Sequence, residues 1–574
     1  MLKDELGRLN CLKQSARRFQ DLYEIIVSTD PNKVSALWID DEGKECSRSF
    51  KQLDEDVHAA AALFRRSIGE ENEGSFVALM MENRYHWSVA FWGLLMAGYK
   101  PVLFDVNHKK PMIRHLLATS GAVAIVGRSD GKIPVSLITL EEIVDAKPDI
   151  SFIPRFADEL ALCTSGTTNT SKVYVFGPEG IIGQALGVIP KIMECPRLVE
   201  DKKDPIRHLA FLPMHHILGF MVHCILFPLV GKTVVYLKDR APQTIQEACK
   251  RFRVTNLIVV PLLLNNLANG LWKKVKQEGR SKEYFLKTLF TLSNGIQRLL
   301  PKSGPDIAAL LVKSIQKRLL GDSIRTILVG GSHIPLKTLN TINALGYYPM
   351  PGFGMTETGL TSFESRPQAR YRLSGSTTTL EGISYKTVDT EGNNSDIGEL
   401  LIRGGSLHRA RLINGERQAP EYGADGWFKS GDIARLKDGG LYIEGRLKEV
   451  IINESGENVY PDELEDIFEA ITGVERLCIL SLANGSPYED IALVFQLPDN
   501  VIDTQSIAAV AAEMSVRNMK LPIMKRVRRF FVAAQPLPLA NGIKVRRQKL
   551  KEWMEVGEID VRPVDIQSGT IGNV

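Results

Sequence analysis

The sequence predicts an α/β protein in which short, buried, largely parallel strands alternate with helices. Apolar runs of strand length recur along the chain, for example over 76–81, 123–126 and 255–260. Between such runs, apolar residues repeat at helical spacing, as in 53–66 and 86–96. Because unbroken apolar strands are buried on both faces, this alternation indicates parallel sheets that are covered by helices on both sides.

The pattern changes after about residue 374. Between 374 and 445, glycine-rich turns separate short strands such as 398–404, which predicts a β-rich subdomain. The remaining residues, 446–574, have strands and helices of their own and are enough for a small domain. We therefore expect a large domain over 1–445, with the β-rich subdomain at its end, and a small α+β domain over 446–574.

Composition excludes several classes of protein. The chain has 574 residues, of which 44% are hydrophobic and 24% charged, as in ordinary globular proteins. Its 71 basic and 67 acidic residues give a net charge of +4, too small an excess for a dedicated nucleic-acid binder. None of the seven cysteines forms a Cys-x-x-Cys pair, so a disulfide framework or zinc site is not expected. A reducing cytoplasm is the simplest location.

Two apolar stretches are candidates for membrane-spanning segments, but neither has the length and continuity required. The stretch 87–99 is too short to cross a bilayer, and 217–237 is interrupted by His223, Pro228 and Lys232. The charged N-terminus contains no apolar signal core. We expect no spanning helix, whereas peripheral contact with a membrane stays open.

A segment of small hydroxyl residues, 164–172, follows the apolar run 160–163. Its backbone N–H groups and hydroxyls are suited to donate to an anion, and Lys172 adds a compact charge for phosphate oxygens. The segment lacks the spacing of a P-loop, and an ordinary polar loop is the alternative interpretation. The predicted phosphate-binding residues are Thr164, Ser165, Gly166, Thr167, Thr168 and Lys172.

Four further segments follow this loop, at 351–359, 426–432, 445–449 and 537–544. Together, and in this order, the five segments resemble the signature motifs of the adenylate-forming (AMP-binding) superfamily, and most of all the long-chain acyl-CoA synthetases. The resemblance implies a large N-terminal domain of two stacked α/β sheets and a small mobile C-terminal domain. It also implies ATP, Mg²⁺ and coenzyme A as cosubstrates.

The resemblance implies a role for each matching residue. Gly331, Ser332, Gly352 and Phe353 would bind the nucleotide, with the Phe353 ring on adenine where the family more often has Tyr. Asp432 would accept bonds from the ribose hydroxyls, and Arg446 would bind ribose or phosphate.

The catalytic set follows in the same way. Thr356 would donate to the α-phosphate, and Glu357, with Thr164, would hold Mg²⁺. Lys544 would bridge the acid and the α-phosphate, and His216 would line the acyl pocket.

The sequence departs from the family pattern at three places in the phosphate loop: Asn169, Ser171 and Val173. The junction after Arg446 is one residue longer than the family spacing. Lys448 and Glu449 therefore both remain hinge candidates.

The substrate signals favour a medium- to long-chain fatty acid. No aspartate follows Pro213 where amino-acid-activating relatives carry one. The segment between 261 and 330 resembles the helical insert of long-chain enzymes. From 517 to 551 there are eleven basic residues and no acidic one. This stretch would suit the phosphates of CoA or an acidic acyl-carrier protein, or it is a solvated helix face plus an edge strand over 525–532.

The function we expect is ATP-dependent conversion of a fatty acid to acyl-AMP, followed by transfer to CoA, giving acyl-CoA, AMP and pyrophosphate. Two alternatives stay open. One is a ligase that loads an acyl-carrier protein, and the other is a non-catalytic regulator that binds acyl groups or nucleotide.

Overall fold

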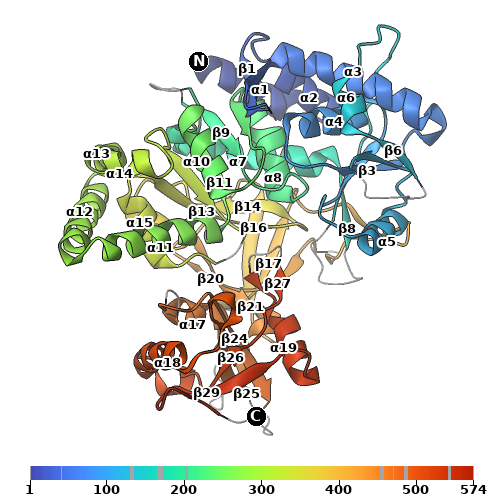
Figure 1. Ribbon diagram of the computed structural model, residues 1–574. Helices are drawn as coiled ribbons and strands as arrows, with labels where there is room; N and C mark the ends of the chain where they lie inside the picture. The colour runs from blue at the N-terminus through green and yellow to red at the C-terminus, as the bar shows by residue number, and fades with distance from the viewer. Residues whose placement is uncertain are drawn as a thin grey trace. The chain divides into compact units, whose positions relative to one another are not determined.

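The computed structural model describes residues 2–40, 42–128, 135–163, 172–200, 205–331, 333–423, 425–452, 458–468, 471–483, 489–540 and 544–572. The chain forms two compact units (Figure 1). Unit 1 comprises Met1–Tyr385 and Ile402–Phe428, and unit 2 comprises Lys386–Leu401 and Lys429–Val574. The β-rich segment 374–445 is thus shared between the units, and the expected boundary at 445/446 stays a prediction.

The first sheet of unit 1 has the strand order β19-β18-β8-β7-β4-β3-β5-β6. Its strands are β3 (Phe76–Met80), β4 (Lys100–Leu103), β5 (Ala124–Gly127), β6 (Ser136–Ile138), β7 (Leu160–Cys163), β8 (Val173–Phe176), β18 (Ala410–Ile413) and β19 (Glu416–Gln418). The strands β3 to β7 pair in parallel, and β8, β18 and β19 add antiparallel pairs. Its associated helices are α3 (Phe50–Ile68), α4 (Tyr85–Met96), α5 (Lys110–Ser120) and α6 (Leu140–Val144).

The second sheet has the order β15-β14-β13-β12-β11-β9-β10-β1-β2. Its strands are β1 (Val34–Ile39), β2 (Glu45–Ser49), β9 (Arg207–Ala210), β10 (Thr233–Tyr236), β11 (Asn256–Val259), β12 (Thr326–Val329), β13 (Tyr348–Met355), β14 (Gly359–Phe363) and β15 (Thr378–Thr379). Strands β1 and β9 to β13 are parallel to their neighbours in the middle of the sheet. The helices of this part are α1 (Leu2–Ser15), α2 (Phe19–Val27), α7 (Pro178–Glu194), α8 (Ile217–Phe220), a π-helix (Met221–Leu226), α9 (Phe227–Leu229), α10 (Pro242–Arg251), α15 (Leu336–Ala344) and α16 (Ala369–Arg372).

One hydrophobic core joins the two sheets. It contains side chains of β3, β5 and β7 from one sheet and of β10 and β13 from the other, with α4 and α7 among them. Helix α4 is apolar almost all round, as a helix buried on every side must be. The rings of Trp87 and Phe91 pack on Phe220 of α8. The prediction of an α/β fold with two stacked sheets is therefore confirmed.

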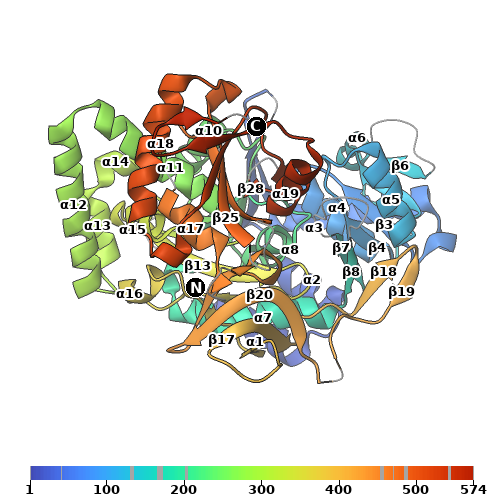
Figure 2. The same ribbon diagram turned by 90° about the horizontal axis from the view of Figure 1, so that it is seen from below.

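A helical insert lies between β11 and β12. It consists of α11 (Pro261–Gln277), α12 (Arg280–Leu299), α13 (Gly304–Leu311) and α14 (Lys313–Arg318). Both ribbon views show α12 and α13 at the outer edge of unit 1, outside the sheet (Figures 1 and 2).

Unit 2 contains most of a four-stranded sheet, β16-β17-β20-β21, and a five-stranded sheet, β24-β25-β26-β29-β30. The first is built from β16 (Ile383–Val388), β17 (Ile397–Gly404), β20 (Phe428–Lys437) and β21 (Gly440–Arg446). The second is built from β24 (Arg476–Ala483), β25 (Glu489–Gln496), β26 (Arg529–Ala533), β29 (Val561–Asp565) and β30 (Thr570–Ile571). Two short pairs are β22 (Ile451–Ile452) with β23 (Asn458–Val459) and β27 (Leu539–Ala540) with β28 (Lys544–Val545).

Helices cover both faces of the five-stranded sheet. They are α17 (Pro461–Phe468), α18 (Thr504–Met519) and α19 (Arg547–Val556). Figure 2 shows α18 and α19 on opposite sides of β25, and the side chains of these two helices belong to separate cores. This is the small α+β domain that the sequence predicts.

The expectation of an edge strand over 525–532 is wrong. Strand β26 lies in the sheet interior, parallel to β25 and antiparallel to β29. Phe530 and Val532 enter one core, whereas Phe531 and Ala533 enter the other. Because both faces are buried, the strand itself is apolar, and the basic residues are confined to its first position and the turn before it.

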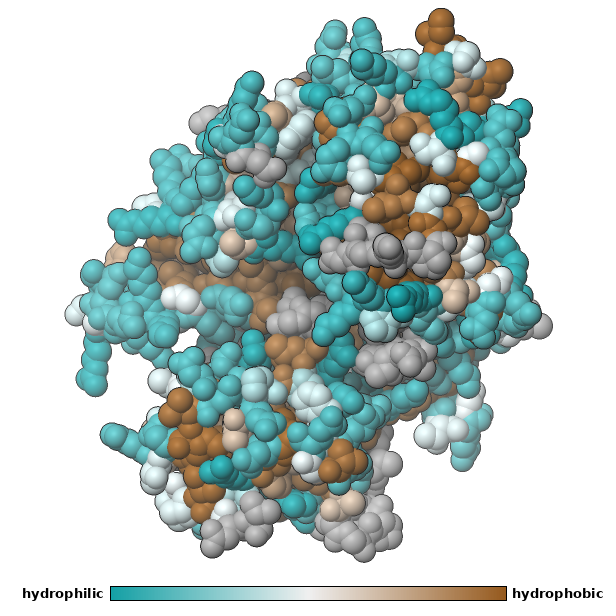
Figure 3. Space-filling model, turned by 45° about the vertical axis from the view of Figure 1, so that its right-hand side comes forward, coloured by the Kyte–Doolittle hydropathy of each residue, from teal (hydrophilic) through white to brown (hydrophobic). Residues whose placement is uncertain are grey.

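The surface follows the usual division. On the face drawn in Figure 3, hydrophilic side chains cover most of the surface and hydrophobic ones gather in patches between them. Within the described residues, no helix is both long and apolar enough to span a bilayer.

Candidate active site

A carboxylate, Glu421, organises three polar side chains beside the start of β8. Lys172 Nζ donates to Glu421 Oε1 over 2.7 Å, and Arg411 Nη1 donates to the same oxygen over 2.6 Å. Tyr174 Oη donates to Oε2 over 3.0 Å. Antiparallel pairing of β8 with β18 places Arg411 directly opposite Tyr174. The predicted phosphate-binding Lys172 is therefore held by a carboxylate.

These contacts keep Glu421 ionised. Partial burial works to raise the pKa of Glu421, but the hydrogen bonds from Lys172 and Tyr174 outweigh it and the pKa lies below its usual value. A carboxylate that stays charged at neutral pH can hold the lysine ammonium in place without sharing a proton with it.

His408 connects this cluster to Glu357. The backbone N–H of Glu421 donates to His408 Nε2 over 3.2 Å, so the ring proton sits on Nδ1. Nδ1 then donates to the carbonyl oxygen of Glu357 over 3.1 Å, and the His408 backbone N–H donates to the same oxygen. Burial lowers the pKa of His408 and keeps the ring neutral. The predicted phosphate ligand Lys172 and the predicted magnesium ligand Glu357 thus belong to one hydrogen-bonded network.

The predicted nucleotide-binding residues of unit 1 lie at the carboxyl ends of β12 and β13. Val329 of β12 is paired with Pro351 of β13, so Gly331 and Gly352 follow at the same edge. A Cβ on Gly330 would lie 2.8 Å from the carbonyl oxygen of Gly352, so this approach requires glycine. Phe353, Thr356 and Glu357 continue the chain at this edge and are half-buried. In open α/β sheets, ligands bind at this end of the strands.

A histidine pair lies near the end of β4. His216 occupies the N-cap position of α8 without a capping hydrogen bond from its side chain, and the rings of His215 and His216 are 4.3 Å apart. His215 Nε2 lies 3.6 Å from Asp105 Oδ2, and Asp105 follows β4. Desolvation, together with the nearby His216, lowers the pKa of His215 to about 3, although Asp105 works in the opposite direction. The pair is therefore neutral at pH 7.

Arg240 adds a positive charge to this neighbourhood. Its side chain is exposed, yet desolvation by the surrounding protein lowers its pKa, with Asp105 opposing the shift. Arg240 also acts electrostatically on His215 and His216. A guanidinium that is accessible but partly desolvated is suited to pair with an anion from solvent.

In unit 2, Asp432 and Arg446 face each other across β20 and β21. The two residues are paired in register, and Arg446 Nε lies 2.7 Å from Asp432 Oδ1. The Asp432 side chain is buried, whereas that of Arg446 is 53% exposed. The pairing brings the two predicted ribose-binding residues together.

The junction candidates differ in their contacts. Lys448 is exposed in the short helix Leu447–Glu449, whereas Glu449 forms an ion pair with the buried Arg547. A hinge residue must change its backbone angles, and Lys448 has fewer side-chain contacts to lose. This contrast favours Lys448.

Arg547 is the centre of an ion cluster in unit 2. Besides Glu449, its Nη2 contacts Asp462 over 2.7 Å and Glu465 over 2.8 Å, and its Nε donates to the Ile479 carbonyl over 2.6 Å. Burial lowers the pKa of Arg547 to about 10, so it stays charged at pH 7.

Replacing Arg547 by methionine should destabilise unit 2 by about 3–5 kcal/mol, because three carboxylates then lose their shared counter-ion. Urea denaturation combined with hydrogen exchange at the amides of α17 and α19 measures this loss. Lys549→Met on the same helix is the control, since Lys549 pairs with Glu552 only at 3.9 Å on the surface. Equal stability of the two variants would contradict a structural role for the cluster.

Much of the basic stretch 517–551 is likewise paired with acids of the same domain. Lys525 contacts Glu463, and Lys551 contacts Glu489. Its role in binding CoA stays a prediction.

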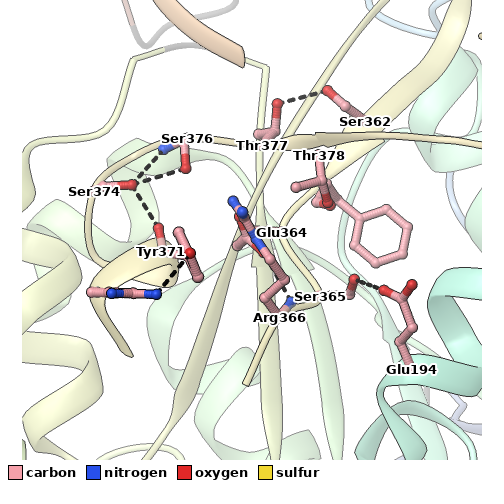
Figure 4. A network of polar contacts seen from close by, with 12 residues as sticks. Glu194, Ser362, Glu364, Ser365, Arg366, Tyr371, Ser374, Ser376, Thr377 and Thr378 are labelled. Atoms are coloured by element: carbon pink, nitrogen blue, oxygen red, sulfur yellow. Dashed lines mark hydrogen bonds and ion pairs between the residues drawn. The ribbon is translucent and has the colours of Figure 1, made fainter. Parts of the chain in front are cut away.

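A second polar network lies at the end of β14 (Figure 4). Arg366 donates from Nε and Nη2 to the buried Glu364 over 2.9 and 2.6 Å, and its guanidinium lies over the Tyr371 ring. Ser365 donates to Glu194 of α7 over 2.6 Å. Because these charged groups are matched to one another and tie α7 and α16 to β14, we assign this network a structural role.

Several predicted site residues lie outside the described residues: Thr164, Ser165, Gly166, Thr167, Thr168 and Ser332. Lys544 is described only through its backbone, in β28 opposite Ala540. Sequence reasoning missed Glu421, His408, Tyr174 and Arg411. No motif marks them, and only the pairing of β8 with β18 brings them to Lys172.

Comparisons with known proteins agree with the geometry. The family described as AMP-binding enzyme matches residues 24–410. A long-chain-fatty-acid–CoA ligase from Salmonella typhimurium is 24% identical, with 89% of this chain and 91% of the relative covered. A long-chain-fatty-acid–CoA ligase 2 from Schizosaccharomyces pombe is 28% identical over 61% of this chain and 52% of the relative.

Solved structures share the fold. O-succinylbenzoate coenzyme A synthetase (MenE) from Bacillus subtilis, in complex with ATP and magnesium ion, superposes with a TM-score of 0.70 at 20% identity, covering 92% of this chain and 99% of that one. ATP-bound MatB from Rhodopseudomonas palustris superposes with a TM-score of 0.69 at 18% identity, covering 93% of this chain and 99% of that one.

Proposed function

Because the chain belongs to the AMP-binding enzyme family and is an adenylate-forming acid–CoA ligase, we propose that its substrate is a medium- to long-chain fatty acid. In the first step, a carboxylate oxygen bonds to the α-phosphorus of ATP, and pyrophosphate leaves with the electrons of the broken P–O bond. In the second, the CoA sulfur, having lost its proton, bonds to the acyl carbon and AMP leaves.

The observation that carries the adenylation chemistry of this proposal is the network from Lys172 through Glu421 and His408 to Glu357. It gives a cation for phosphate oxygens and a carboxylate for a metal ion in one hydrogen-bonded unit. Both are needed when two anions are brought together for phosphoryl transfer.

The residues present fit Mg²⁺. Mg²⁺ keeps several waters and takes one or two carboxylates besides the phosphates of its nucleotide. The half-buried Glu357, whose backbone is held by His408, would supply one such carboxylate. Thr164 would be its partner, and the ion would neutralise phosphate charge.

On the same proposal, Gly331, Ser332, Gly352 and Phe353 bind the nucleotide, with the Phe353 ring on adenine. Asp432 binds the ribose, and Arg446 binds ribose or phosphate. Thr356 donates to the α-phosphate and Lys544 bridges the two anions. His216 lines the acyl side. The long-chain preference is supported by the relatives that are named long-chain-fatty-acid–CoA ligases and by the helical insert α11–α14.

The test is pyrophosphate release with Mg·ATP across saturated acids of increasing length, with and without CoA. We expect release to rise with chain length and acyl-CoA to appear only with CoA. A protein that releases pyrophosphate but acylates only a carrier protein would be the carrier-loading ligase. Nucleotide binding without release would identify a regulator.

Arg240 favours a second candidate, an acid with a second carboxylate. Its positive charge works to lower the pKa of His215 and of His216, and its exposed guanidinium is suited to pair with a carboxylate. One relative of the chain, a bovine enzyme named malonate–CoA ligase, is 24% identical over 71% of this chain. Dicarboxylic acids therefore belong in the same panel, and Arg240→Leu should abolish a dicarboxylate preference while leaving fatty acids unaffected.

A further inference from the structure

Helix α12 of the insert carries apolar side chains on two opposite faces. Leu286 and Phe290, with Ser293 and Gln297, form its buried face. Phe285, Leu292 and Leu299 are 67%, 53% and 82% exposed. Their spacing of seven residues puts all three on one side of the helix, away from the buried face. The helix therefore presents a stripe of three apolar side chains to solvent, one at every second turn.

The neighbouring helix α13 extends this exposure. Ile307, Leu310 and Leu311 are 38%, 71% and 42% exposed, and α13 packs against α12. Tyr284 on α12 is also 75% exposed. Single exposed apolar side chains are ordinary on protein surfaces, but several on two adjacent helices mark an interaction surface.

The insert also carries a positive charge. From 261 to 318 it has eleven basic residues and three acidic ones, a net charge of +8, whereas the other 60 basic and 64 acidic residues give −4. Its three carboxylates are paired: Glu278 with Lys282, Glu283 with Lys287, and Asp306 with Arg197 of the preceding segment. Just after α14, Asp322 contacts Lys313 and Lys317. The eleven basic residues include Lys273, Lys274 and Lys276, which are exposed at the end of α11.

The exposed apolar side chains and the large positive charge together indicate which kind of partner fits this face. A second copy of the chain would bring +8 against +8, which opposes association through this face. An anionic lipid surface satisfies both features, because apolar side chains enter the boundary of the acyl region while lysine ammonium groups reach lipid phosphates. We propose that the outer face of α12 and α13 docks on an anionic phospholipid bilayer.

The experiment is sedimentation of the full-length protein with vesicles. One set is phosphatidylcholine alone, and the other contains equal parts of phosphatidylcholine and phosphatidylglycerol. We expect binding to the anionic vesicles that weakens as salt is raised. The variant Phe285→Ser with Leu292→Ser and Leu299→Ser should bind at least about tenfold more weakly. Each of the single substitutions Lys273→Gln, Lys274→Gln and Lys276→Gln should lower the affinity for anionic vesicles about fivefold.

The matched control is Ile150→Ser with Ile153→Ser, which removes apolar side chains that are 105% and 75% exposed outside the insert. It should bind as the parent protein does. Circular dichroism and thermal unfolding establish that each variant is folded. Failure of the parent protein to bind anionic vesicles, or equal binding by the Phe285, Leu292 and Leu299 variant, overturns the proposal. So does a parent dimer that this variant converts to a monomer, since a second copy then covers the stripe. Turnover is not measured, so the result is independent of the proposed substrate.

Discussion

Lys544→Ala should lower adenylate formation by at least about 10²–10³-fold while leaving thioester formation from supplied acyl-AMP largely intact. The physical reason is that the first step brings the acid's carboxylate into contact with the anionic α-phosphate of ATP. A carboxylate must approach the α-phosphate, and a cation between them stabilises the transition state by an amount typical of a lost electrostatic donor. In the second step the acyl group is already a neutral mixed anhydride carbonyl, and the acid no longer needs a counter-charge.

The two steps are separable by measurement. ATP–pyrophosphate exchange reports the first, and release of AMP from supplied acyl-AMP and CoA reports the second. Lys549→Ala, five residues on and in a long surface ion pair, is the control and should change neither. If Lys544→Ala slowed both steps equally, its assigned role would be refuted and a general effect on the small domain would be indicated.

The sequence predicts the regular part of this fold well because burial leaves a local signal. Strands β3 and β11 and helices α3 and α4 lie where apolar runs and helical spacing predict them. Strand β26 is the counter-example. Basic residues before Phe530 suggest an edge, but pairing on both sides is a tertiary property that no local pattern encodes.

The residues of the candidate site likewise fall into those that the sequence predicts and those that it does not. Residues inside motifs, such as Glu357 and Asp432, are predictable from spacing. Glu421 is 249 residues from Lys172, and its position depends on the register of β18 on β8. A one-residue slip of that register would turn Arg411 to the other face. Such partners become visible only once the strands are paired.

The insert illustrates a further limit. Apolar residues at helical spacing on α12 indicate an amphipathic helix, but spacing does not say which of two apolar faces meets the core. Leu286 and Leu292 are both leucines of one helix, and only the first is buried.

The second large expected effect is acid unfolding of unit 1. His208, His215, His223 and His408 are all buried. Desolvation is the largest cause in each case, lowering the pKa of His215 and of His223 to about 3, that of His208 well below its usual value, and that of His408 below it. His208 Nε2 and His223 Nδ1 share a 2.8 Å hydrogen bond, which two charged rings could not form.

The direction of the pH dependence of stability follows from the numbers of protons that the folded and unfolded chains bind. These histidines have a lower pKa in the folded chain than in the unfolded one, so below pH 6.5 the unfolded chain binds more protons. The stabilisation is complete above pH 6.5 and is lost as the pH falls toward the folded pKa values. Each such histidine contributes about 1.4 kcal/mol per pH unit. The three with the most strongly lowered pKa values, His208, His215 and His223, together give about 4 kcal/mol per pH unit, against a typical total of about 5–15 kcal/mol.

Urea denaturation between pH 7.5 and pH 5 measures this dependence. His408→Gln keeps a donor for the Glu357 carbonyl and an acceptor for the Glu421 N–H but cannot titrate, so it should reduce the slope, by at most about 1.4 kcal/mol per pH unit. A stability that is flat from pH 7.5 to pH 5 would mean that these rings reach water or a counter-ion in the folded protein. The neutral tautomer assigned to His408, and with it the link between Lys172 and Glu357, would then be wrong.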